Sequence, residues 1–297
     1  MTDEKDSNFT PIRELIGTAY EQIESQYNNC EHTKGLSSGF YDLDNILSGF
    51  LPSDLIVVAS RPSMGKTSFC YNIALESALK NKKNVLLFST ESSNEQVVSR
   101  LLCIEAEVDT MRLKTVHMQR EDWERLTKAM ESFAESNLCI NTSARLSVLE
   151  VENECKKMIE EHGSLDLVII DYLQLMDVEQ GADRIWGMTE IARKLKILAR
   201  ELNIPIVVSS QISRAVETRT NKRPTLIDLS ESGAIEQVAD IIVFIYRKEY
   251  YEPDNFNIKG LAELIIAKHR SGPTDTIELL FRNNITKFKN KTISSVF

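Results

Sequence analysis

The chain has 297 residues, of which 42% are hydrophobic and 27% are charged, enough to bury the core of one large α/β domain. No run of about 18 apolar residues occurs and the N-terminus is charged, so we expect neither a membrane span nor a secretory signal. The net charge of −9 taken alone argues against a nucleic-acid binder, although a local basic strip can bind phosphates on an acidic protein. The five cysteines form no Cys-x-x-Cys pair, which predicts reduced structural thiols in a cytosolic protein: Cys30, Cys70, Cys103, Cys139 and Cys155.

The first 28 residues divide into a tail and a helix. Residues 1–9 are polar and are expected to be a disordered tail. Thr10-Pro11 is typical of a helix start, and it opens an amphipathic helix over 10–28. Its apolar residues recur at helical spacing: Ile12, Leu15, Ile16, Ala19, Tyr20, Ile23 and Tyr27. The pattern leaves open whether this face covers its own domain or packs on a neighbouring subunit.

From residue 35 to 297 the chain alternates strands with helices, which predicts one α/β domain with a mostly parallel sheet covered on both faces. The last part instead predicts antiparallel hairpins at a sheet edge. The expected strands are Leu55–Ala59, Val85–Thr90, Leu138–Asn141, Leu167–Asp171, Ile204–Ser210, Ile241–Tyr246, Ala262–Lys268, Thr276–Phe281 and Ile285–Phe288. The expected helices are Lys66–Lys80, Asn94–Ala106, Arg120–Ser136, Leu149–His162 and Trp186–Leu202.

A phosphate-binding loop is predicted between the first strand and the first helix of this domain. Backbone N–H groups at a helix start point at an anion, Lys66 can reach the β- and γ-phosphates of a nucleotide, and the Thr67 hydroxyl can ligate Mg²⁺. Ser60 stands where the general pattern has Gly, and a small residue there still permits the turn. The predicted nucleotide-binding residues are Ser60, Arg61, Pro62, Ser63, Met64, Gly65, Lys66, Thr67 and Ser68.

Three further strands end in polar side chains, and parallel strands bring such ends to one edge of the sheet. Asp171 is a predicted Mg²⁺ ligand, unless it only caps a turn. Glu91 is the candidate general base that polarises the attacking water, or else an acid that favours the following helix start. Gln211 is a candidate sensor of the γ-phosphate, or an amide with a local hydrogen bond.

These residues together resemble the DnaB-type replicative helicases, hexameric motors with a RecA-like ATPase core. The resemblance covers nearly the whole chain from about Thr10, and its segments follow the family's order. They are Arg61-Pro62-Ser63-Met64-Gly65-Lys66-Thr67, Ile170-Asp171-Tyr172-Leu173-Gln174-Leu175-Met176, Ser210-Gln211-Ile212-Ser213-Arg214-Ala215-Val216-Glu217, Asp228-Leu229-Ser230-Glu231-Ser232-Gly233-Ala234-Ile235-Glu236-Gln237 with Ala239-Asp240, and Ala267-Lys268-His269-Arg270-Ser271-Gly272-Pro273-Thr274.

The resemblance implies a role for each matching residue. Glu91 corresponds to the catalytic glutamate, Asp171 to the Walker B acid and Gln211 to the γ-phosphate sensor. Lys268 and Arg270 match the pair that reaches the neighbouring subunit's site, although two solvated charges on an edge hairpin would give the same pattern. The implied DNA contacts lie on a channel loop, whose basic residues could also be merely solvated: Arg214, Arg219, Lys222, Arg223, Ser230, Glu231 and Gly233.

The implied protein is an ATP- and Mg²⁺-dependent helicase core that forms a homo-hexamer, moves 5′ to 3′ on single-stranded DNA and unwinds forks. A helicase loader and a primase are possible partners, in the cytoplasm and in bacterial, plasmid or phage replication. Family members usually carry a further helical N-terminal domain, so the chain is expected to be a short or truncated form whose helix over 10–28 is the family's linker helix.

The chain departs from the family pattern at three positions, and two other functions stay open. Ser230 replaces a usual Arg, Gly187 a usual Glu, and Thr90 a larger apolar residue. One alternative is a RecA- or KaiC-like ATPase without unwinding activity. The other is a non-motor nucleotide-binding module that regulates another helicase.

Overall fold

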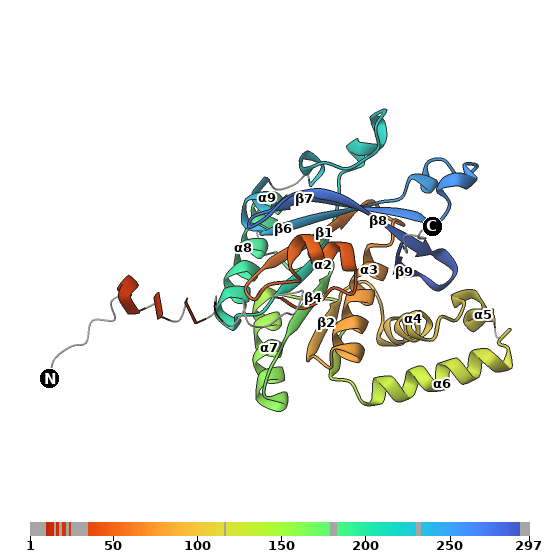
Figure 1. Ribbon diagram of the computed structural model, residues 1–297, viewed down its shortest axis with the longest axis horizontal. Helices are drawn as coiled ribbons and strands as arrows, with labels where there is room; N and C mark the ends of the chain where they lie inside the picture. The colour runs from red at the N-terminus through yellow and green to blue at the C-terminus, as the bar shows by residue number, and fades with distance from the viewer. Residues whose placement is uncertain are drawn as a thin grey trace.

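A nine-stranded sheet forms the centre of the computed structural model, which describes residues 10–14, 16–17, 20–21, 24, 35–115, 117–178, 183–229 and 233–291 (Figure 1). Its strand order is β3-β2-β4-β5-β1-β6-β7-β8-β9. The strands are β1 (Leu55–Ser60), β2 (Val85–Ser89), β3 (Leu138–Asn141), β4 (Leu167–Asp171), β5 (Ile206–Gln211), β6 (Ile241–Tyr246), β7 (Leu261–His269), β8 (Asp275–Arg282) and β9 (Lys287–Asn290).

The first six strands in chain order are parallel, and β6 to β9 pair antiparallel, so the mixed sheet expected from the sequence is confirmed. The last strand is an exception. It was expected at Ile285–Phe288 but occupies Lys287–Asn290, because Asn283–Ile285 forms a 3-10 turn. The turn ends at Thr286 in the left-handed conformation, and pairing with β8 resumes only beyond it.

Helices cover both faces of the sheet, as its central strands require, because these are continuous apolar runs buried along their whole length. One core packs α2, α3 and α4 on one face, and the other packs α7 and α8 on the opposite face. Residues one apart along β1 belong to different cores, with Ile56 and Val58 in the first and Val57 in the second. The helices are α2 (Tyr41–Leu47), α3 (Lys66–Leu75, continued by a π-helical turn, Glu76–Lys80), α4 (Asn94–Ala106), α5 (Thr110–Thr115), α6 (Arg120–Ala134), α7 (Val148–His162), α8 (Arg184–Leu202) and α9 (Gly233–Val238).

Three helices of this domain were not expected: α2, α5 and α9. Each is only six or seven residues long, too short for a helical period to stand out from the sequence. Within the described residues, no helix combines the length and the apolar character needed to cross a membrane. Four of the cysteines are free thiols, and Cys30 lies outside the described part of the chain.

The predicted N-terminal segment consists of a tail and a helix. The expected tail over 1–9 lies outside the described residues. Within 10–28 the described residues from Ile12 to Glu24 are helical, and they project from the domain (Figure 1). Their apolar side chains are largely exposed, with Ile12 at 79%, Ile16 at 63% and Tyr20 at 65%. The described apolar side chains of this segment therefore do not pack on the domain.

Asp54, just before β1, is expected to make stability depend on pH. Burial, with repulsion from Asp240, raises its pKa from the ordinary 3.8 to about 6, although Lys196 and a backbone hydrogen bond at Leu51 oppose this. A raised carboxyl pKa means that the ionised form destabilises the folded state above pH 6, and that this cost disappears as pH falls toward 4. Asp54→Asn should therefore raise the free energy of unfolding at pH 7.5 by about 1–2 kcal/mol, allowing for partial exposure.

Urea unfolding of both proteins at pH 7.5 and at pH 4 measures this effect. The gain should be much smaller at pH 4, where the carboxyl group is neutral in the folded chain and its ordinary pKa of 3.8 leaves it only partly ionised in the unfolded chain. An Asn variant that is less stable at pH 7.5 would show that the Asp54 carboxylate is stabilising instead.

Candidate nucleotide-binding site

The turn between β1 and α3 has the backbone shape of a phosphate-binding loop. Ser63 and Gly65 are left-handed, with φ of 66° and 99°, so successive N–H groups face a common concavity at the start of α3. A Cβ on Gly65 would lie 2.9 Å from the Phe288 ring, so glycine is required there for space as well as for conformation. Ser60 has no positive φ, and its hydroxyl donates to the Arg61 carbonyl at 2.9 Å, so this position needs no glycine.

The two predicted metal ligands lie together under this loop. Thr67 Oγ1 donates to Asp171 Oδ2 at 2.7 Å, joining the start of α3 to the end of β4. The other carboxylate oxygen, Oδ1, accepts from the Ser209 hydroxyl on β5. A hydroxyl and a buried carboxylate are hard oxygen donors, so this pair fits Mg²⁺. The described residues contain no group of three or more His, Cys, Asp or Glu side chains that could hold a metal.

Lys66 is held next to these ligands in a partly dry site. Its Nζ lies 4.3 Å from the centre of the Tyr172 ring. Burial lowers the pKa of Lys66, while the negative charges of Asp171 and Glu91 oppose that shift. A cation kept at a desolvation cost is poised to gain from a phosphate group.

Glu91 lies just past β2 with an exposed side chain, near enough to Lys66 and Tyr172 to affect the pKa of each. Thr90 fixes this strand end: its N–H donates to the Asp171 carbonyl at 2.9 Å, and its hydroxyl accepts from the Tyr172 N–H at 3.3 Å. A larger apolar residue at 90 could not make the hydroxyl contact, which gives this departure from the family pattern a physical reason.

Gln211 ends β5 beside Asp171 and is held by a residue that the sequence analysis did not single out. Gln174 Oε1 accepts from the Gln211 N–H at 3.1 Å, and its Nε2 donates to Ser210 Oγ at 2.8 Å. Gln174 comes from the 3-10 turn after β4, so it ties together the ends of two neighbouring strands. The sequence analysis also did not identify Ser209 as a site residue. Ser209 lies two positions before Gln211, so the two side chains are expected on the same face of the strand.

Arg61 turns away from the loop concavity. Its Nε donates to Glu217 Oε1 at 2.8 Å and its Nη1 to the Ile212 carbonyl at 2.9 Å, with the side chain only 8% exposed. Only the backbone of Arg61 is thus available to a nucleotide, and the side chain links the loop to the segment after β5. Met64 is buried as well.

Arg247, after β6, supports the loop from the other side and was also missed. Its Nη1 donates to the Ser63 carbonyl at 3.2 Å, and its guanidinium lies 4.1 Å from the centre of the Phe281 ring. A cavity of about 740 Å³ opens beside it and reaches Tyr250 and Asn283. This cavity is large enough for a small molecule, and Arg247 connects it to the loop, whose own residues do not line it.

Most cations of the predicted DNA segment are paired within the fold. Arg219 Nη2 lies 2.5 Å from Asp228 Oδ2, Arg223 lies 2.8 Å from Glu263, and Lys222 donates to the Glu217 carbonyl. Arg214 is exposed and has no ion pair with the described residues. Within the part of the chain that the structure describes, three of the four cations in this segment are therefore already bonded to other groups of the fold and only Arg214 is available to bind DNA phosphates. The predicted contacts Ser230 and Glu231 lie outside the described residues, and Gly233 begins α9.

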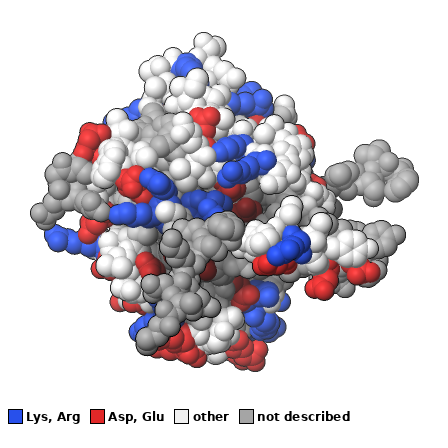
Figure 2. Space-filling view, turned by 90° about the vertical axis from the view of Figure 1, so that its left-hand side faces the viewer, with Lys and Arg blue, Asp and Glu red and all other residues white. Residues whose placement is uncertain are grey.

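The predicted trans-acting pair lies at the opposite end of the sheet from the phosphate-binding loop. Arg270 N donates to the Asp240 carbonyl, and Asp240 N to the Leu55 carbonyl, so Arg270 is level with the start of β1. The loop follows the end of β1, on the order of 17 Å away along the strand. Figure 2 shows Lys and Arg side chains gathered across the middle of one face of this acidic protein.

Comparison with known families decides the relationship, because the profile described as DnaB-like helicase C terminal domain matches residues 35–290. The chain belongs to the DnaB-like helicase C-terminal domain family. It is 42% identical over 287 residues to the replicative DNA helicase DnaB of Geobacillus stearothermophilus, covering 95% of this chain and 62% of that protein. It is 46% identical over 258 residues to a probable replicative DNA helicase of Trieres chinensis, covering 86% and 57%.

Solved structures agree with this family. A solved ATPase domain superposes with a TM-score of 0.90 at 35% identity, covering 96% of this chain and all of that one. A DnaB-like replicative helicase studied with primase gives 0.88 at 35% identity, covering 97% and 68%. The RecA-like fold expected from the sequence is thereby confirmed. The chain spans less than two thirds of the length of the curated relatives named above.

Proposed function

We propose that this domain hydrolyses ATP as the core of a replicative DNA helicase. The observation that carries the proposal is the contact between Thr67 and Asp171 beneath a loop in which Ser63 and Gly65 are left-handed. In this proposal the loop N–H groups and Lys66 bind the phosphates, and Glu91 accepts a proton from the water that attacks the γ-phosphate. Mg²⁺, held by Thr67 and Asp171, would neutralise charge on the β- and γ-phosphates. The cavity beside Arg247 gives the rest of the nucleotide room.

Geometry supports a catalytic site shared by two subunits. Arg270 lies level with the start of β1, whereas the phosphate-binding loop follows the end of that strand. Its side chain is 67% exposed at the end of the sheet away from the fold's own nucleotide site, so it can complete the site of a second copy. Repeated head-to-tail contacts of this kind close into a ring, and we propose the homo-hexamer of the family.

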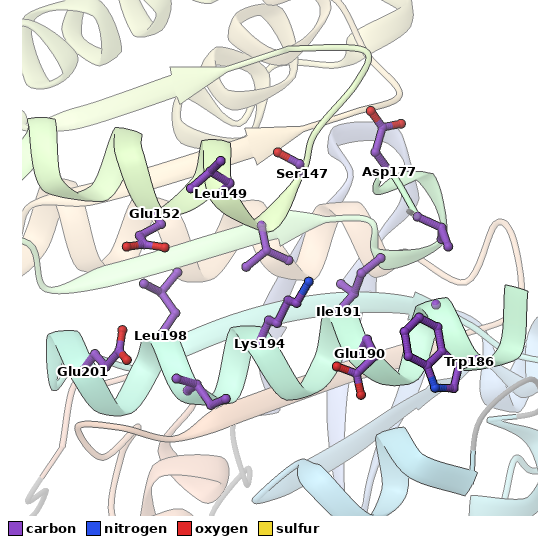
Figure 3. A pocket seen from close by; sticks show the side chains of 14 residues that line it. Ser147, Leu149, Glu152, Asp177, Trp186, Glu190, Ile191, Lys194, Leu198 and Glu201 are labelled. Carbon is purple, nitrogen blue, oxygen red and sulfur yellow. The ribbon is translucent and has the colours of Figure 1, made fainter. Parts of the chain in front are cut away.

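A groove between α7 and α8 offers a docking place for the N-terminal helical residues of the neighbouring subunit (Figure 3). Its volume is about 610 Å³, and Leu149 and Trp186 line it although they are 64% and 53% exposed. Gly187 also lines it, and a Cβ there would lie 2.1 Å from Val178 Cγ1, so glycine lets that segment pack against α8. The exposed apolar face from Ile12 to Tyr20 has the spacing to fill such a groove.

Ile197→Asp should weaken ring assembly, because it places a charge in this groove at a residue that is 44% exposed and does not support the core. We expect at least a tenfold rise in the dissociation constant of the ring, measured as molar mass by light scattering with ATP and Mg²⁺. Ile16→Asp, on the N-terminal helical segment that would fill the groove, should raise the dissociation constant by a similar factor. Met130→Asp on α6, 60% exposed and remote from the groove, is the matched control. Unchanged assembly of both groove variants would place the contact elsewhere.

In this proposal, contact with DNA depends on few charged side chains. Arg214 and the backbone N–H groups around Gly233 are the candidates to hold the phosphates of single-stranded DNA, with movement 5′ to 3′ as in the family. Ser230 supplies no charge there, so we expect a shallow salt dependence of binding. We further propose a primase and a helicase loader as partners, with a cytoplasmic role in bacterial, plasmid or phage replication.

Two assays on the same preparation test this function. ATP turnover should rise with added single-stranded DNA, and a forked duplex should be unwound in the presence of ATP and Mg²⁺. DNA-stimulated turnover without unwinding would support a RecA- or KaiC-like ATPase. Nucleotide binding with no stimulated turnover, even at low salt, would support a non-motor module that regulates another helicase.

A further inference from the structure

The last turn of α9 and the two-residue link to β6 hold both members of the predicted trans-acting pair. Lys268 Nζ donates to three carbonyl oxygens, those of Glu236 at 2.5 Å and Gln237 at 3.3 Å in α9 and that of Ala239 at 2.6 Å in the link. Arg270 is attached at the end of the same link, because its backbone N–H donates to the Asp240 carbonyl at 2.9 Å. Two cations on one strand are thus fixed by five consecutive residues of another segment.

Among the described residues, Asp240 is the side-chain partner of Arg270. Its Oδ1 lies 3.4 Å from Arg270 Nη1. Its Oδ2 accepts from the Leu55 N–H at 2.8 Å and from Lys196 Nζ at 2.5 Å. The Asp240 side chain is 8% exposed, whereas that of Arg270 is 67% exposed. The guanidinium therefore contacts a buried partner at one nitrogen, while most of the Arg270 side chain is exposed.

Asp240 could stabilise the fold without any contact to Arg270, because its charge and one of its oxygens have other partners. Lys196 balances the charge of this carboxylate, and the Leu55 N–H satisfies the oxygen that faces the strand. The second oxygen faces Arg270, at a single-point contact too long and too exposed to add much stability. This contact can still restrict the direction in which the long side chain of Arg270 points.

We propose that Asp240 is a positioning residue that orients Arg270 toward the nucleotide of the neighbouring subunit. The inference rests on the proposed function, in which that site is shared between subunits. It also connects the predicted DNA segment to the catalytic pair, because α9 begins at Gly233, its last turn binds Lys268, and the residues that follow it bind Lys268 and Arg270. A shift of α9 would move Lys268 and Arg270 together.

Asp240→Asn keeps the size of the side chain and an acceptor for the Leu55 N–H but loses the charge that attracts Arg270. We expect kcat for ATP in assembled rings to fall roughly ten- to hundredfold, as for a misdirected catalytic group, with KM changed less than about twofold. Asp240→Glu, which retains the charge, should recover part of kcat. Lys196→Met is the matched control, because it removes the structural partner of Asp240 and leaves the Arg270 contact in place.

A structural role would lower stability in both Asp240→Asn and Lys196→Met and would leave kcat per folded ring the same in both. The positioning role predicts a loss of kcat in Asp240→Asn alone. If Asp240→Asn does not assemble, the comparison of Asp240→Glu with Lys196→Met decides, with a roughly threefold or larger loss of kcat expected only in the Glu variant. Equal kcat in the two variants that are compared would overturn the proposal.

Mixed rings separate this inference from the proposed function. Asp240 acts on the neighbour's site, so Asp240→Asn subunits mixed with Glu91→Ala subunits should regain turnover, whereas a mixture with Arg270→Ala subunits should not. Recovery in an Arg270→Ala and Glu91→Ala mixture, without recovery for Asp240→Asn and Glu91→Ala, would overturn the role of Asp240 alone. No recovery in either mixture would overturn the shared site and the inference with it.

Discussion

Lys66→Ala is expected to lower ATP turnover about 10³-fold, equivalent to roughly 4 kcal/mol of transition-state stabilisation. The physical reason is the loss of the one lysine placed over the Tyr172 ring next to Asp171, where charge on the transferring phosphoryl group would be greatest. Phosphate release at saturating ATP and Mg²⁺ measures the effect.

The same variant should fold normally. Burial lowers the pKa of Lys66, which means that the fold holds this charge at a cost, and replacing it should leave the melting temperature unchanged or higher. Lys80→Ala, at the exposed far end of the same helical stretch, is the matched control and should retain full turnover. Normal hydrolysis by Lys66→Ala would mean that this loop does not bind the reacting phosphates.

The sequence predicts the sheet well because its central strands are buried on both faces. Such strands are continuous apolar runs, and the one containing Asp171 has the predicted bounds, Leu167–Asp171. Polar residues at the ends of these runs must meet at one edge of a parallel sheet, so Thr67 and Asp171 could be paired across 104 positions before their contact was known.

Contacts that support the site from a distance could not be predicted in this way. Gln174 reaches Gln211 from a 3-10 turn, and Asp240 reaches Leu55 across 185 positions. Neither contact leaves a local pattern, because each depends on which loops the finished sheet brings together. The basic residues after β5 show the opposite case, in which the sequence predicts available side chains that the fold has already paired. Arg219 and Arg223 look free in sequence, yet each has an acidic partner that only the fold supplies.

Arg270→Ala is expected to give the second large effect, a fall in ring ATP turnover of about 10³–10⁵-fold, as for other trans-acting arginines in phosphoryl transfer. Nucleotide binding by single subunits should be unchanged, because Arg270 lies at the end of the sheet away from its own loop. Its side chain is 67% exposed, so the variant should also fold and assemble. Arg120→Ala, an 89% exposed arginine on α6, is the control for removing a surface cation.

Mixing Arg270→Ala with Glu91→Ala subunits turns this loss into a test of geometry. An interface is intact when the subunit that binds ATP supplies Glu91 and its neighbour supplies Arg270, and random assembly of equal amounts produces this pairing at about one interface in four. ATP turnover should therefore recover toward a quarter of the wild-type value, although each variant alone is inactive. If both residues acted on the same subunit's nucleotide, no mixture could contain an intact site. Turnover would then stay at the level of the single variants, and Arg270 would have no role in the neighbour's chemistry.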